Sequence, residues 1–164
     1  MKIANRMENL SPSVTMAITA LARELKAQGK DILSFSAGEP DFDTPEIIKQ
    51  AAIKAINDGQ TKYTAVEGII ATKQAIINKL KKDHNLDYKL DNILISNGAK
   101  HSLFNLFQVL VEEGDEVIIP APYWVTYPEQ VKFSDGVPVF IDTDDSTEFK
   151  ITPEQLKAVI TPKT

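Results

Sequence analysis

The stretch Ile93-Leu94-Ile95-Ser96-Asn97-Gly98-Ala99-Lys100, followed by the apolar-periodic run 102–111, decides the fold. It predicts a strand, a tight turn at Gly98 and the first turn of a helix, because short apolar runs suit buried strands and apolar residues at helical spacing suit helices. Unpaired backbone N–H groups and the positive end of the helix dipole then face whatever lies at the end of the strand. This turn is therefore a candidate anion site.

Strand and helix patterns alternate from Asn92 onward. We expect strands at 93–96, 116–119 and 137–141, and helices at 99–112, 124–134 and 153–160. Strands separated by helices imply a parallel sheet with crossover helices. The further strand that this alternation requires after residue 160 is missing, and the predicted strands are fewer than a sheet usually has. We therefore expect an incomplete sheet, cut off in the middle of a larger fold.

The first half of the chain is predicted to be mainly helical. Ser11-Pro12-Ser13 is a helix start, with a cap residue and an early proline. Thr44 and Pro45 form a second start, with Thr44 as the cap and Pro45 at the first helical position. A third helix is expected over 67–83, and 32–35 is a short strand candidate.

The composition is that of an ordinary globular domain and restricts the functional class. The chain has 164 residues, 43% of them hydrophobic, and a net charge of -5, which disfavours nucleic acid or an anionic membrane as partner. It has no cysteine, so thiolate catalysis and zinc-thiolate sites are excluded. The sequence lacks a signal-peptide pattern and a run of about 20 apolar residues that could span a membrane. We expect a cytoplasmic protein without a metal site.

Four positions are candidates for ligand contact, and each also has a purely structural interpretation. Gly98-Ala99-Lys100 could cradle a phosphate or simply join strand to helix; it matches neither the dinucleotide fingerprint nor the Walker loop. Gly38 could offer its N–H to a carboxylate or merely form a turn. Trp124, the only tryptophan, could stack on an aromatic ring or cover the sheet, and Tyr63 could donate to a phosphate or pack at the surface.

Four motifs in this order resemble the N-terminal part of a class I aminotransferase that depends on pyridoxal 5′-phosphate, most closely the bacterial aspartate aminotransferases. The resemblance covers essentially the whole chain, and the family's full chain is more than twice as long. The motifs are Ser36-Ala37-Gly38-Glu39-Pro40-Asp41-Phe42, Lys62-Tyr63-Thr64 with Gly68, Ser96-Asn97-Gly98-Ala99-Lys100, and Pro120-Ala121-Pro122-Tyr123-Trp124 with Tyr127-Pro128.

The resemblance assigns a role to each candidate. It implies that the backbone of Gly38 meets the substrate carboxylate and that Tyr63 reaches the partner subunit's cofactor phosphate in a homodimer. Gly98, Ala99 and Lys100 match the phosphate-cradling turn. Trp124 matches the aromatic residue stacked on the pyridine ring, next to the substrate. The implied fold is the αβα large domain of fold type I, with 1–45 linked to the small domain and 46–164 forming the first part of the cofactor-binding domain.

The catalytic residues of the family are not among these 164. The Schiff-base lysine stands in an S-x-x-K context, which no lysine here occupies. We therefore expect the full-length protein to move an amino group between an amino acid, aspartate by resemblance, and a 2-oxo acid, 2-oxoglutarate. The 164-residue chain alone should be inactive and prone to associate through apolar residues that lack cover. Alternatives are a non-catalytic truncated paralogue or interaction module, and a lyase or another amino-acid aminotransferase of the same family.

Overall fold

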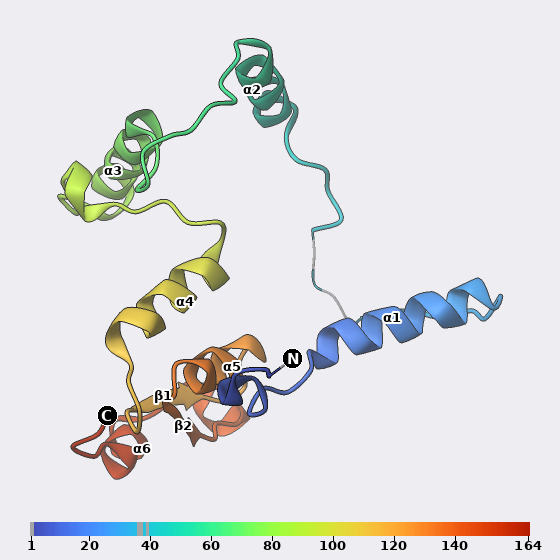
Figure 1. The fold of residues 1–164 in the computed structure, drawn as a ribbon, viewed down its shortest axis with the longest axis vertical. Helices are drawn as coiled ribbons and strands as arrows, with labels where there is room; N and C mark the ends of the chain where they lie inside the picture. Colours follow the sequence, from blue (N-terminus) through green and yellow to red (C-terminus); the bar gives the residue numbers. More distant parts are fainter. Residues whose placement is uncertain (1, 36–37, 39) are drawn as a thin grey trace. The chain divides into compact units, whose positions relative to one another are not determined.

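The structure is a computed structural model that describes residues 2–35, 38 and 40–164 (Figure 1). The chain divides into two compact units. The first, formed by Met1–Ala37 and Ala99–Thr164, is called the sheet unit, and the second, Gly38–Gly98, is called the helical unit.

The sheet unit is built on two parallel strands joined by a helix. Ile118 lies opposite Val139 in the ladder between the strands. Parallel neighbours require a crossover connection, and α5 supplies it. This confirms the α/β character and the parallel direction that the alternating pattern predicted. The elements are β1 (Glu116–Pro120), β2 (Val137–Ile141), α4 (Ala99–Leu110) before them, α5 (Thr126–Phe133) between them, and η3 (Asp145–Thr147) and α6 (Pro153–Val159) after them.

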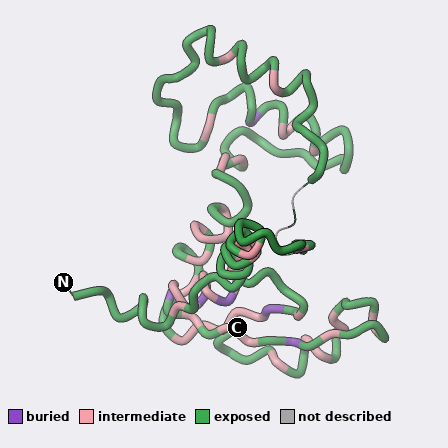
Figure 2. The backbone as a smooth tube through the Cα atoms, turned by 90° about the vertical axis from the view of Figure 1, so that its right-hand side faces the viewer, coloured by how far each residue is buried: buried purple, intermediate pink, exposed green. Residues whose placement is uncertain are grey.

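The core of this unit is small and lies where α5 packs on the strands. Ile119 in β1 and Ile141 in β2 are 5% and 4% exposed, and Val131 in α5 is fully buried. Figure 2 shows how few of the described residues are buried. Many large apolar side chains remain exposed, including Phe35 and Val109. Large apolar residues outside the strands therefore lack cover, whereas Ile119, a strand residue expected to lack it, is buried, and association of the chain stays a prediction.

The chain after α6 returns to the amino end of β1. The N–H of Val137 donates to the carbonyl of Asp115 on the β2 side, at 2.7 Å. The N–H of Glu116, which belongs to the same peptide group as that carbonyl, donates to the carbonyl of Lys163, also at 2.7 Å. Because the C=O and N–H of one peptide group point in opposite directions, Lys163 lies at the edge of β1 away from β2.

The opening segment is attached to α5. The guanidinium of Arg6, in η1 (Asn5–Met7), lies over the ring of Phe133, 5.7 Å from its centroid. The N–H of Ser11 donates to the carboxylate of Glu129 at 2.8 Å. The helix α1 (Val14–Ala27) then begins after Ser13, whose hydroxyl caps it by accepting from the N–H of Met16. A serine cap agrees with the predicted helix start, but the cap is Ser13, so Pro12 precedes the helix and is not its early proline.

The helical unit contains α2 (Glu46–Asn57), α3 (Ile70–His84) and η2 (Leu90–Asn92). The last of these packs against α3. The N–H of Ile95 donates to the carbonyl of Glu67 at 3.0 Å. This bond brings the segment after η2 against the loop that precedes α3.

Two predicted strands and one predicted cap are wrong in detail. Residues 32–35 and 93–96 are not strands. A strand exists only when it pairs with a neighbour, and apolar alternation does not supply one. In α2 the cap position is taken by Pro45, not Thr44, and no side chain caps that end. The helix therefore begins one residue later than predicted, at Glu46.

The described helices include none that combines the length and the apolar character needed to cross a membrane. The predicted boundary at residue 45 between two domains stays a prediction.

Candidate functional site

The loop that follows β1 is fixed to the end of β2. The N–H of Ala121 donates to the carbonyl of Ile141 at 2.8 Å, which extends the ladder by one bond. The hydroxyl of Thr143 donates to the carbonyl of Ala121. Both bonds lie at the carboxyl ends of the two strands, the edge where parallel sheets position ligand-binding residues.

Trp124 is positioned by its two neighbours along the chain. Before it, the ring of Tyr123 stacks on that of Phe140 in β2, with centroids 5.0 Å apart and planes inclined by 18°. After it, the N–H of Tyr127 donates to the carbonyl of Trp124 at 3.0 Å, a turn that leads into α5. The indole itself is 46% exposed. The sequence thus builds an anchored loop that leaves the indole partly accessible.

Lys100 lies against Trp124. Its ammonium nitrogen is 5.3 Å from the centroid of the indole ring, which is a cation–π contact. Its carbonyl accepts a hydrogen bond from the side-chain amide of Gln130 at 2.8 Å. Since Lys100 is the second residue of α4 and Gln130 belongs to α5, this bond ties the start of one helix to the other.

An apolar hollow of about 520 Å³ adjoins the indole. It is lined from α4 by Leu103 and Phe107, from β1 by Val117 and Ile119, and by Trp124. These side chains bring no charge to the hollow, so the nearby ammonium of Lys100 supplies the positive charge at this edge. A flat ring that carries an anionic group matches this combination.

The residues present fit pyridoxal 5′-phosphate on these grounds. The first turn of the 12-residue helix α4 offers the N–H groups of Ala99 and Lys100, which have no partner within the helix. Its dipole and the Lys100 ammonium both favour a phosphate. The partly exposed indole of Trp124 can stack on an aromatic ring. These groups of the chain could bind and orient the cofactor, and no lysine of the chain stands in the S-x-x-K context.

The other candidates belong to the helical unit. Gly98, its last residue, has φ +80°, and no atom lies within 4 Å of where a Cβ would stand. The turn therefore needs glycine for its backbone conformation and not for space. Tyr63 is fully exposed. Gly38 is open on the Cβ side, while Ser36, Ala37 and Glu39 of the same motif lie outside the described residues.

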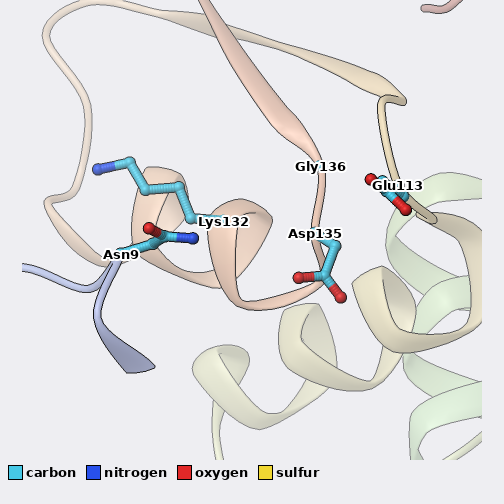
Figure 3. Close-up of a pocket in the computed structure, with 5 residues that line it drawn as sticks. All are labelled: Asn9, Glu113, Lys132, Asp135 and Gly136. Carbon is cyan, nitrogen blue, oxygen red and sulfur yellow. The ribbon is translucent and has the colours of Figure 1, made fainter. Parts of the chain in front are cut away.

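A second hollow, of about 670 Å³, lies at the other end of the two strands (Figure 3). Glu113 precedes β1, and Asp135 and Gly136 precede β2, so this hollow is at the amino ends of the strands. It carries charges of both signs, and Lys132 is already paired with Glu129 at 3.0 Å. It is therefore a polar surface groove and not the candidate site. In the described part of the chain no three His, Asp or Glu side chains are grouped to hold a metal ion.

Three residues that position the site were missed by the sequence analysis. Phe140, Thr143 and Gln130 contact the site through stacking or hydrogen bonds across the fold. No motif marks them, because their role depends on which strand and helix lie next to each other. Period-two alternation in β2 could have placed Phe140 on one face, but not opposite Tyr123.

The chain matches known aminotransferases over its whole length. It is 57% identical over 164 residues to an aspartate aminotransferase of Geobacillus stearothermophilus, covering 100% of this chain and 42% of the relative. It is 54% identical over 164 residues to an aspartate/prephenate aminotransferase of Nitrosomonas europaea, covering 100% and 41%. A solved aspartate aminotransferase from Thermus thermophilus with maleate superimposes with a TM-score of 0.95 at 41% identity, covering 100% of this chain and 43% of that chain.

These relatives agree with the predicted family and with the predicted partial fold. The chain spans about two fifths of the length of each relative, 41–43%. The family model described as aminotransferase class I and II matches residues 30–164. The chain therefore belongs to the class I and II aminotransferases.

Proposed function

We propose that this chain is the N-terminal, cofactor-orienting part of a pyridoxal-phosphate-dependent aminotransferase of the aspartate type. The full-length protein would move an amino group from aspartate to 2-oxoglutarate. Pyridoxal phosphate, when bound, supplies the electron sink that makes this transfer possible. The residues of this chain would hold its phosphate at the first turn of α4 and cover its ring with Trp124.

The single observation that carries the proposal is the contact of Lys100 with Trp124. A cation over an accessible indole, beside an apolar hollow and a helix N-terminus, suits a flat aromatic anion. The aspartate preference is supported by the names of the relatives and by the Thermus structure, which contains the dicarboxylate maleate. The role of Gly38 toward the substrate carboxylate, and that of Tyr63 across a homodimer, remain predictions, as does the cytoplasmic location.

A chimaera tests the proposal directly. Residues 1–164 are joined to the remaining part of the Geobacillus relative, and formation of oxaloacetate from aspartate and 2-oxoglutarate is followed with a coupled dehydrogenase. We expect transamination by the chimaera and none by the 164-residue chain alone. Replacing Trp124 by alanine in the chimaera should weaken cofactor binding and lower the rate. A correctly folded chimaera without transaminase activity would contradict the proposal and favour a non-catalytic paralogue.

Prephenate is the second candidate substrate, because the Nitrosomonas relative is named for both acids. The same chimaera can be assayed with prephenate as amino acceptor. An alanine aminotransferase from Pyrococcus furiosus also superimposes with a TM-score of 0.93, at 27% identity. Alanine is therefore included as an alternative donor, and the ratio of kcat/KM values decides among these substrates.

A further inference from the structure

We propose that Gln130 is a positioning residue that holds Lys100 over Trp124 and thereby strengthens the binding of a ring-bearing anion. The identity of that anion, a pyridoxal-type phosphate, rests on the proposed function. The positioning itself does not, because it concerns three residues of the sheet unit whose contacts are present in the free chain.

Gln130 and Trp124 are linked through one short helix. The helix α5 begins at Thr126, two residues after Trp124, and the carbonyl of Trp124 is held by its first turn. Gln130 lies on this same helix and donates from its amide nitrogen to the carbonyl of Lys100 at 2.8 Å. The bond therefore fixes the backbone of Lys100 relative to the helix whose first turn holds the carbonyl of Trp124.

Only one of the two polar atoms of the Gln130 side-chain amide forms a hydrogen bond within the described residues. Its oxygen is buried and accepts no hydrogen bond from any described residue, whereas its nitrogen donates to Lys100. A buried unpaired acceptor is unfavourable, and an apolar side chain of similar length would avoid it. The group that this position supplies to the fold is therefore the N–H donor, and its acceptor is the carbonyl in the first turn of α4.

Anchoring the backbone of Lys100 reduces the conformational entropy that this residue must lose when a ligand binds. A lysine side chain has many rotamers, and ordering it opposes any contact that it makes. With the backbone fixed, the ammonium is already 5.3 Å from the indole centroid. A ligand then meets a charge and a ring that are preorganised, which raises affinity without a new contact.

The chain offers a matched control on the same pair of helices. The side-chain amide of Gln108, farther along α4, donates to the hydroxyl of Ser134 at the end of α5, at 2.7 Å. Gln108→Met removes a bridging amide between α4 and α5 just as Gln130→Met does. It does so away from Trp124. Methionine and glutamine have similar helix propensity and length, so both variants test the lost hydrogen bond.

The first measurement uses no ligand. The ε-methylene protons of Lys100 are recorded by NMR in the 164-residue chain, where the ring current of the single tryptophan shifts them upfield. We expect Gln130→Met, and also Gln130→Glu, to lose most of this shift, and Gln108→Met to retain it. An unchanged shift in both Gln130 variants, or an equal loss in the Gln108 variant, overturns the proposal. Circular dichroism checks that each variant is folded.

The second measurement is a titration with pyridoxamine 5′-phosphate, which has the same ring and phosphate but no aldehyde to react with lysines. We expect Gln130→Met to weaken binding about two- to fivefold, the range of an exposed cation–π contact, and Gln108→Met to leave it unchanged. In a Lys100→Met background, Gln130→Met should have no further effect; a further loss of similar size overturns the proposal. Absence of binding by the unmodified chain counts against the proposed function, while the NMR result still decides the role of Gln130.

Discussion

The ring of Tyr123 lies 5.0 Å from that of Phe140, centroid to centroid, and the two planes are inclined by 18°. Phe140 is part of β2, whereas Tyr123 belongs to the loop that follows β1. A residue of one strand therefore fixes the loop at the end of the other, immediately before Trp124. The orientation of the indole depends on the pairing of the strands as well as on its own sequence neighbours.

Replacing Phe140 by alanine should loosen this loop. We expect a loss of about 0.5–1.5 kcal/mol from the aromatic pair and weaker binding of pyridoxamine 5′-phosphate. Urea unfolding measures the loss of stability, and the fluorescence emission of Trp124 during a titration measures ligand binding. Phe149→Ala is the control, since Phe149 is an exposed aromatic in the turn after η3. Equal effects of both substitutions on ligand binding would contradict the role given to the stack.

The small core leads to a prediction about the effect of two valine substitutions on stability. Val131 in α5 is fully buried, whereas Val109 in α4 is 81% exposed. Val131→Ala should reduce the free energy of unfolding by roughly 2 kcal/mol, because the methyl groups leave a cavity under the sheet. Val109→Ala should be neutral or slightly stabilising, because alanine is the better helix former. Denaturant titration followed by circular dichroism compares the two, and a similar change in both would show that α5 does not hold the core.

The helices were predictable because their signals are local. The pattern places a helix start at Ser11-Pro12-Ser13, and Ser13 caps α1 in the structure. Thr152 and Gln155 form a capping box at the start of α6. The helix itself lies within the range predicted, 153–160. A cap and the apolar spacing that follows it are contained in a few consecutive residues, so no tertiary information is needed.

The strands were predictable only where the chain contains their partners. The segments 116–119 and 137–141 were both expected, and they form β1 and β2 because each is the neighbour of the other. The segment 93–96 has the same apolar character, but the N–H of Ile95 donates to a loop carbonyl, that of Glu67. Apolar patterning identifies what can be buried in a sheet and does not identify what lies beside it.

For the candidate site, too, the residues marked by local patterns were predictable and their tertiary neighbours were not. That Lys100 and Trp124 follow β-strand-like segments suggested one edge of a sheet, and the structure brings the two side chains together. The amide of Gln130 and the ring of Phe140 could not be foreseen, because each contact joins elements that are remote in the sequence. Contacts of this kind orient the site and leave no motif in the sequence.

The turn at η3 gives a pH-dependent prediction. Hydrogen bonds from the hydroxyl and the N–H of Ser146 hold the pKa of Asp144 below its usual value. A lowered folded-state pKa stabilises the turn above the unfolded-state pKa, and this stabilisation is lost as the pH falls through the folded-state value. Ser146→Ala should raise the pKa of Asp144 toward its ordinary value in an NMR titration. The pKa of Glu46, lowered by Gln50 and Lys49, should not move, and a parallel shift there would indicate a general effect.

The last prediction concerns the lysines. The family's cofactor lysine has an S-x-x-K context, and none of the lysines of this chain has it. Treating the chain with pyridoxal phosphate and borohydride should therefore label exposed lysines in part, such as Lys54 and Lys79, whose side chains are 74% and 76% exposed. Lys73, which is 5% exposed, should stay unlabelled. Peptide mapping by mass spectrometry measures each site, and the chimaera with the Geobacillus relative, which should label fully at one lysine, is the positive control. Stoichiometric labelling of a single lysine in the 164-residue chain, at Lys100 above all, would mean that this chain supplies its own covalent anchor for the cofactor.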